Sequence, residues 1–159
     1  MINYRVSYGA AYQWLFSKAS VLHHLASLAG RLYVANVFFS AGLVKIRDWE
    51  TTMFLFEEEY QVPLLSPVLG AYLGTFGELF FPILLLIGLG TRFAAAGLFV
   101  VNVVAVLSLA EIAPAAYYLH VIWGLVLGHL VIYGGGWFSA DAYLKIECPK
   151  LIRRQTALY

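Results

Sequence analysis

The chain is poor in cysteine and in charged residues. It has a single cysteine among 159 residues, Cys148, which excludes an internal disulfide framework and any CxxC redox or zinc motif. Charged residues make up 12% of the chain, about half of the roughly 25% of an ordinary soluble domain. A formal net charge of +1 gives no reason to expect a nucleic-acid partner.

Hydrophobic residues take the place of the missing charges. They make up 62% of the chain, and the mean hydropathy is +0.78. A water-soluble fold of this length cannot bury so much apolar surface. The composition therefore predicts a single domain whose main partner is the lipid bilayer.

Four long apolar segments dominate the sequence. They cover residues 26–46, 64–89, 93–110 and 116–133. A helix that spans a bilayer needs about 20 mostly apolar residues, and none of the segments shows the two-residue alternation of a strand. Short connections place neighbouring helices antiparallel. We expect an all-α membrane protein, in which residues 26–137 form a four-transmembrane-helix antiparallel bundle.

Two flanking segments lie outside these spans. In residues 1–25, apolar and aromatic side chains recur at helical spacing, which predicts an amphipathic helix that lies in the membrane interface. A flexible N-terminus with scattered aromatic residues is the alternative. Residues 138–159 form a basic tail.

The distribution of lysine and arginine predicts the orientation. With four spans, both termini share one side with the turn at Arg92, and that side carries seven basic residues against two on the other. The seven are Arg5, Lys18, Arg92, Lys145, Lys150, Arg153 and Arg154, and the two are Lys45 and Arg47. The positive-inside rule places both termini in the cytoplasm.

Polar residues inside the spans are the candidate functional residues, because a charge at mid-bilayer costs roughly 2.5–3.5 kcal/mol. Gly70, Gly74 and Glu78 follow one another at intervals of four residues and so share one face of a helix. Small residues at this spacing let helices approach closely, which predicts that Glu78 faces the bundle. We expect one buried polar site that binds a polar head group or relays protons, with an Arg31–Glu78 pair in it. Its candidates are Arg31, Asn36, Glu78, Asn102 and His129. A second cluster near the outer surface comprises Lys45, Glu111 and His120.

These residues have a structural interpretation beside the functional one. A buried Arg–Glu pair can simply fix the helix register, or it can bind a polar head group or relay protons. His120 and His129 are nine residues apart and project from opposite sides of a helix, so they do not form a metal motif. We expect neither a metal site nor a haem site, and the sequence has no signature of a catalytic nucleophile.

An ordered set of short motifs resembles the DoxX family of small four-helix membrane proteins. The motifs are FSAGLVK at Phe39–Lys45, GELFFPILLL at Gly77–Leu86, GLGTR at Gly88–Arg92 and GGGWFSAD at Gly134–Asp141. The resemblance covers residues 28–145 and includes an arginine early in the first span. The polar positions that match the family are Arg31, Lys45, Glu78, Arg92 and Asp141, of which Arg92 and Asp141 lie at the inner edge.

The resemblance implies a multi-pass protein of a bacterial-type inner membrane. It further implies a membrane subunit of a redox system, which binds a quinone or docks a soluble or peripheral oxidoreductase. The alternatives are a non-catalytic scaffold and, ranked third because the halves show only loose similarity, a small-solute transporter. Fold alone does not decide between these functions. The sequence also leaves open whether the chain forms a homo-oligomer.

Overall fold

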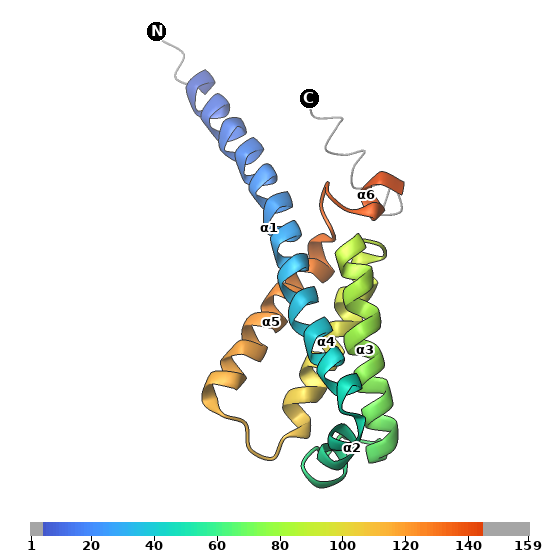
Figure 1. Cartoon of the computed structure of the whole chain (residues 1–159). Helices are drawn as coiled ribbons and strands as arrows, with labels where there is room; N and C mark the ends of the chain where they lie inside the picture. Colours follow the sequence, from blue (N-terminus) through green and yellow to red (C-terminus); the bar gives the residue numbers. More distant parts are fainter. Residues whose placement is uncertain (1–4, 145–159) are drawn as a thin grey trace.

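The structure, a computed structural model, describes the backbone of residues 5–144 and the side chains of residues 21–144. Six helices follow one another along this part of the chain (Figure 1). They are α1 (Arg5–Arg47), α2 (Trp49–Glu58), α3 (Pro67–Ile87), α4 (Thr91–Ser108), α5 (Pro114–Tyr133) and α6 (Ala140–Leu144). Four of them, namely the Val21–Arg47 part of α1 and the whole of α3, α4 and α5, are long and apolar enough to cross a membrane. The predicted all-α membrane fold is confirmed.

Local signals in the sequence set the ends of α3. Ser66 caps its N-terminus by accepting a hydrogen bond from the backbone N–H of Leu69 at 3.4 Å, and Pro67 occupies the first turn. Gly88 ends the helix with φ of +75°, a left-handed conformation that favours glycine. A Cβ atom at Gly88 would lie 2.7 Å from Nη1 of Arg31, so a larger residue is excluded by space as well.

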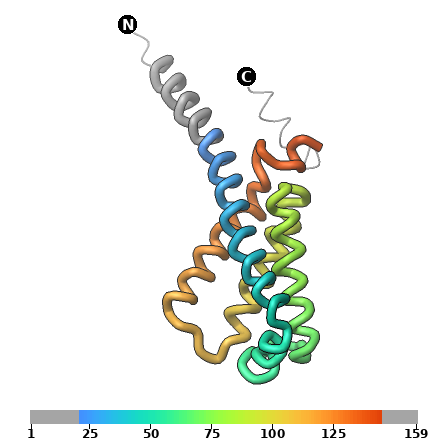
Figure 2. Tube along the Cα trace, in the orientation of Figure 1, coloured from blue at the N-terminus to red at the C-terminus, as the bar shows by residue number. Residues whose placement is uncertain are grey.

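The four spanning helices run up and down, and their packing is uneven along the bundle. α1 packs mainly on α3, while α4 packs on α5 and α3 (Figures 1 and 2). We call the end that carries Gly88, Gly134 and α6 the terminal end, and the opposite end the α2 end. The buried core lies toward the terminal end and comprises Val34, Ala35, Phe38, Leu85, Ala94, Ala95, Leu98, Leu127 and Leu130. Toward the α2 end the bundle encloses a cavity.

Two elements differ from the sequence prediction. The N-terminal segment is continuous with the first span: from Arg5 onward it belongs to the same helix, α1. The first connection holds an unpredicted helix, α2, whose N-terminus is capped by Asp48. Asp48 accepts hydrogen bonds from the backbone N–H and the hydroxyl of Thr51 at 3.0 and 2.7 Å, and these bonds lower the pKa of Asp48 below its ordinary value. Short polar capping pairs of this kind are easily overlooked beside the longer apolar pattern.

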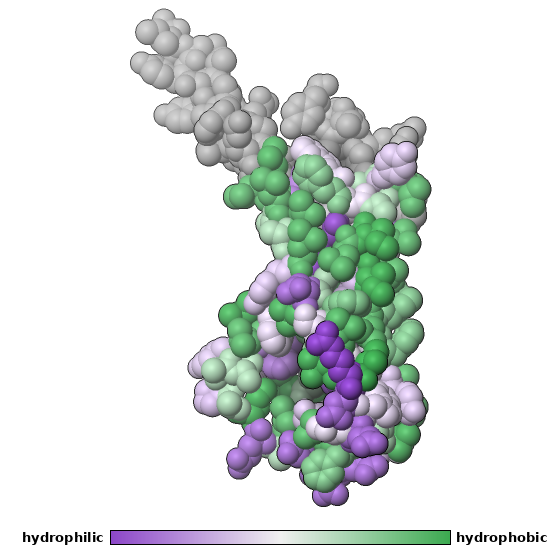
Figure 3. All heavy atoms as spheres, in the orientation of Figure 1, coloured by the Kyte–Doolittle hydropathy of each residue, from purple (hydrophilic) through white to green (hydrophobic). Residues whose placement is uncertain are grey.

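The surface agrees with insertion in a bilayer. On the face shown in Figure 3, hydrophobic residues cover much of the middle of the bundle, and hydrophilic residues gather at the α2 end. Large apolar side chains are exposed on every spanning helix, for example Val44, Phe76, Leu107 and Leu125 at 58–71%. Lipid is the medium that covers such side chains without cost.

Candidate functional site

An ion pair joins α1 to α3 in the α2-end half of the bundle. Nζ of Lys45 lies 2.5 Å from each carboxylate oxygen of Glu78. The side chains are 21% and 9% exposed, so both charges lie largely out of solvent. Gly42 permits this approach of the two helices, because a Cβ atom there would lie 2.8 Å from the side chain of Leu79 and 3.2 Å from Cβ of Glu78. The pair is thus built into the α1–α3 contact.

Glu78 also occupies an unusual backbone position. Pro82 lies inside α3, four residues later, and has no backbone N–H. The helical hydrogen bond to the carbonyl of Glu78 therefore cannot form. Glu78 thus combines a charged side chain with a backbone carbonyl that lacks its helical hydrogen-bond donor, and it does so within a span.

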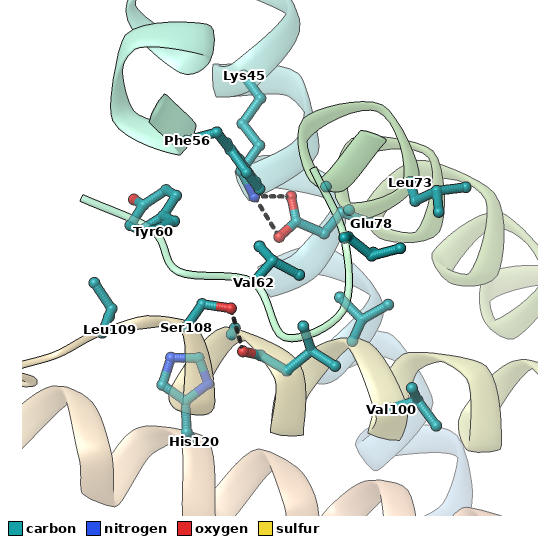
Figure 4. Close-up of a pocket in the computed structure, with 16 residues that line it drawn as sticks. Lys45, Phe56, Tyr60, Val62, Leu73, Glu78, Val100, Ser108, Leu109 and His120 are labelled. Carbon is teal, nitrogen blue, oxygen red and sulfur yellow. Dashed lines mark hydrogen bonds and ion pairs between the residues drawn. The ribbon is translucent and has the colours of Figure 1, made fainter. Parts of the chain in front are cut away.

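The ion pair faces a cavity, here called the α2-end cavity, of about 380 Å³ (Figure 4). The lining comes from α1, α2, α3, α4, α5 and the segment after α2. Most of the wall is apolar, with Leu73, Val100 and Val104 among the residues that line it. The polar side chains on the wall are those of Lys45, Tyr60, Glu78, Ser108 and His120. Such a mostly apolar cavity with a few polar groups is typical of a small-molecule site.

His120 of α5 lines this cavity (Figure 4). Asn102 of α4 orients its ring. Nδ2 of Asn102 donates to the backbone carbonyl of His120 at 2.9 Å, and Oδ1 of Asn102 lies 2.8 Å from Nδ1 of His120. With this orientation of the amide, Nδ1 of a neutral His120 carries the proton, because Oδ1 can only accept. Nε2 is then unprotonated and can accept a hydrogen bond or a proton.

Phe56 of α2 and Tyr60 just after it line the cavity on the side of α2. The segment after α2 is fixed to the end of α4 by a hydrogen bond from the N–H of Gln61 to the carbonyl of Ser108, at 2.8 Å. A second groove of about 430 Å³ between α1 and α2 shares Lys45, Phe56 and Tyr60 with the cavity. Burial raises the pKa of Tyr60 above its ordinary value, and the carboxylates of Glu59 and Glu78 raise it further. The Tyr60 hydroxyl therefore stays protonated at neutral pH.

The terminal end holds a second, separate set of polar contacts. The guanidinium group of Arg31, which is 1% exposed, donates to the carbonyl of Gly135 at 2.9 Å and to that of Phe138 at 3.0 Å. The carboxylate of Asp141 accepts from the N–H groups of Gly90 and Thr91, each at 2.7 Å. These bonds tie the segment after α5 to α1 and to the start of α4. The motifs around Arg31, Gly88–Arg92 and Gly134–Asp141 thus meet at one end of the bundle.

The structure corrects the expected pairing of the polar residues. Arg31 does not pair with Glu78, because its guanidinium lies beside Gly88, ten residues further along α3. Ten helical residues correspond to about 15 Å along the axis. Glu78 pairs instead with Lys45, which we expected in the outer cluster. Depth within a span was misjudged because the long lysine side chain reaches toward the bundle centre from the last turn of α1.

Four other candidates lie apart from the cavity. Asn36 is exposed on the outer surface of α1, so it belongs to no buried site. Glu111 is exposed in the connection after α4, away from Lys45 and His120 in the cavity wall. His129 lies in the other half of α5, with Nε2 3.3 Å from the hydroxyl of Ser27. Arg92 is half-buried in the first turn of α4, next to the residues that Asp141 caps.

Sequence reasoning missed Phe56 and Tyr60 as parts of the site. Both come from the connection between the first two spans, for which we predicted no helix. The recurrence of Thr52, Phe56 and Tyr60 every four residues was an available signal, since this spacing places them on one face of a helix. Thr52 and Phe56 are indeed the buried residues of α2.

The fold and the site together define a four-helix integral membrane protein with a mostly apolar cavity, which carries a few polar side chains, inside its spanning bundle. The sequence profile of the DoxX family matches residues 26–111, more than half of the chain, and the chain belongs to this family. The match includes Arg31, Lys45, Glu78 and Arg92, and it ends before Asp141. Neither the curated proteins nor the solved structures provide a match.

Proposed function

We propose that the chain is an integral membrane subunit of a redox system and that its α2-end cavity holds the head group of a quinone. One observation carries this proposal: a mostly apolar cavity of about 380 Å³ has an ion pair on its wall together with the ring of His120. A quinone head group is a flat apolar ring with two carbonyl acceptors. A site for it needs apolar walls, hydrogen-bond donors and a route for protons, and the cavity offers groups of these kinds.

The side chains fit such a ligand in distinct ways. The ammonium group of Lys45 donates hydrogen bonds to a carbonyl oxygen of the head group. Nε2 of His120, freed as an acceptor by Asn102, accepts from a hydroxyl of the reduced form. Glu78 holds or releases a proton beside Lys45. When bound, a quinone supplies two-electron, two-proton redox chemistry.

The electrons in this account come from a partner. The proposed partner is a soluble or peripheral oxidoreductase that docks on the membrane subunit. The proposed location is a bacterial-type inner membrane with both termini in the cytoplasm, which follows from the excess of lysine and arginine on the terminal side. In this orientation the α2-end cavity lies in the outer half of the bilayer.

A cavity-filling variant tests the proposal against a matched control. Gly74 lines the cavity, and a Cβ atom there meets only Phe56, at 3.6 Å. Gly74→Leu places an isobutyl group in the cavity. Gly128→Leu makes the same change on α5, where a Cβ atom has no neighbour within 4 Å among the described residues. Short-chain ubiquinone and menaquinone analogues are titrated into the purified protein in nanodiscs, with quenching of tryptophan fluorescence as the signal.

We expect saturable binding to the wild type and to Gly128→Leu, and binding at least tenfold weaker for Gly74→Leu. Equal binding to both variants would contradict the location of the site. No saturable binding to the wild type would contradict the quinone proposal itself.

A non-catalytic scaffold is the second candidate function. The contacts of Arg31 and Asp141 favour it, because both of these family-matching residues bind the chain's own backbone. These hydrogen bonds hold the terminal end of the bundle together. Absence of quinone binding, together with a stable association with a partner protein, would favour this second candidate.

A further inference from the structure

We propose that the chain forms a symmetric dimer through the outer face of α1, in which Asn36 of one copy bonds with Asn36 of the other. The inference does not depend on the proposed quinone site. It starts from the one candidate polar residue of the spans that faces away from the bundle. Asn36 lies two residues beyond Val34, the midpoint of the Val21–Arg47 span, so its amide sits near the middle of the hydrocarbon region.

The geometry of α1 directs Asn36 outward. Val34, Ala35 and Phe38 are at most 4% exposed and mark the side of α1 that packs into the core. At about 100° per residue, Asn36 falls on the opposite side of the helix. Its side chain is exposed, and the described residues offer it no hydrogen-bond partner.

Two comparable polar residues of the spans have partners inside the bundle. Asn102 is 3% exposed and bonds with His120. Glu78 is 7% exposed and bonds with Lys45. The exposed amide of Asn36 at mid-bilayer has no such hydrogen-bond partner among the described residues, and lipid tails cannot provide one. A partner outside the bundle therefore has to provide a polar group at the same depth.

A second copy of this chain meets that requirement. The asparagine amide carries both donors and an acceptor, so two such amides satisfy each other. In a two-fold dimer whose axis lies along the membrane normal, the same residue of each copy meets at equal depth. An unrelated partner would need its own polar residue at that level, whereas a second copy always has one. A single asparagine in a helix–helix interface is also known to fix register and oligomeric state.

The neighbouring positions allow two helices to approach closely. Ala29 lies seven residues before Asn36 and Ser40 four residues after it, and both are exposed on the same side of α1. Small side chains of this kind let helix backbones come together in lipid. Tyr33, which shares this side, is bonded to α5, because its hydroxyl accepts a hydrogen bond from Nε1 of Trp123 at 3.2 Å.

Disulfide cross-linking in native membranes tests the interface. Cys148 is the only native cysteine, so Cys148→Ser gives a background without cysteine. In this background, Ser40→Cys, which keeps Asn36 and lies on the same side of α1, is expected to form a disulfide-linked dimer on mild oxidation. Leu107→Cys is the control, because Leu107 is 62% exposed on α4, does not line the cavity and lies outside the proposed interface. Equal cross-linking of both variants, or cross-linking of the control alone, would overturn the proposal.

Energy transfer between labelled copies in liposomes measures the role of the amide. We expect Asn36→Leu to weaken dimerisation about tenfold, the value for one or two lost interhelical hydrogen bonds. Asn36→Gln keeps an amide and is expected to keep most of the affinity. Leucine favours membrane insertion, and near-ultraviolet circular dichroism checks that the bundle stays folded. A monomeric wild type at all protein-to-lipid ratios, or an unchanged affinity of Asn36→Leu, would refute the asparagine-mediated dimer.

Discussion

Lys45 and Glu78 form a two-pronged ion pair inside the bundle, with Nζ 2.5 Å from both carboxylate oxygens. The pair couples α1 to α3 and lies on the wall of the α2-end cavity. It thus contributes both to the stability of the bundle and to the chemistry proposed for the cavity. The two contributions can be separated by variants.

Removal of Lys45 alone should destabilise the protein strongly. Lys45→Met leaves the carboxylate of Glu78 buried without its counter-ion, and breaking a buried pair in this way costs about 3–5 kcal/mol. The partial exposure of Lys45, at 21%, places the expected loss at the lower end of that range. The free energy of unfolding in mixed micelles, from denaturant titration, measures it.

The double variant Lys45→Met/Glu78→Gln is the control for this prediction. It has no unpaired charge at the site, so it should be more stable than Lys45→Met alone. The single variant Glu78→Gln is measured as well. If the free energy of unfolding falls in the double variant by the sum of its falls in Lys45→Met and Glu78→Gln, the ion pair does not couple the helices energetically.

Asn102 should determine which nitrogen of His120 carries the proton. In the wild type, Oδ1 of Asn102 accepts from Nδ1, which leaves Nε2 unprotonated. Asn102→Leu removes this acceptor, so both neutral tautomers should become populated. Nitrogen chemical shifts of the His120 ring in a selectively labelled sample report the difference. His129, in the other half of α5, serves as an internal reference whose shifts should not change. A protonated Nε2 in the wild type would contradict the assigned role of His120 as an acceptor.

Asp141 should stabilise the start of α4 from a distance of 50 residues along the chain. Its carboxylate accepts from the N–H groups of Gly90 and Thr91, as a capping side chain does. Asp141→Ala should therefore cost about 1–2 kcal/mol and speed amide exchange in the first turn of α4. Asp48→Ala is the matched control, because Asp48 caps α2 and its loss should speed exchange in α2 alone. Unchanged exchange at Gly90 and Thr91 in Asp141→Ala would show that this cap is dispensable.

The pH dependence of stability should include a contribution from Tyr60 on the alkaline side. Its pKa is raised in the folded protein, chiefly by burial, above the ordinary value of 10.0. The folded state therefore holds the phenol proton more tightly than the unfolded state does. The resulting stabilisation is fully present below pH 10 and is lost as the pH rises through the folded pKa. Tyr60→Phe has no phenol proton, so its stability should fall less over this alkaline range. Parallel alkaline unfolding curves of the wild type and Tyr60→Phe would contradict the raised pKa.

The spanning helices could be predicted because apolar length is a strong signal that each span carries in its own sequence. The DoxX resemblance was readable for a similar reason, since its motifs occur in a fixed order along one chain. The partner of Glu78 could not be predicted in this way. Arg31 and Lys45 lie about 40° apart around one helix, so side-chain direction alone left both as candidates. The relative position of α1 and α3 along the bundle axis determines that Lys45 is the partner. This position shows in the close contact of Gly42 with α3, which the sequence alone does not reveal.

The part of the cavity wall that comes from α2 and the segment after it was harder to predict. It depends on α2, a short helix of 10 residues inside a segment that reads as a charged loop. It also depends on long-range backbone pairing between Tyr60 and Leu109, for which the sequence has no local signal. Asn36 illustrates the opposite error: its depth in the span was clear from the sequence, whereas the side of α1 on which it lies follows only from the packing.

Covalent mapping of a bound quinone tests the central claim most directly. A photoreactive quinone analogue is bound to the protein in nanodiscs and irradiated, and the labelled residues are identified by mass spectrometry. The account predicts label on the walls of the α2-end cavity, in residues 56–74 and 100–109, and loss of this label with an excess of unmodified quinone. Specific label confined to the terminal end around Arg31 and His129, or label that excess quinone does not displace, would contradict the account.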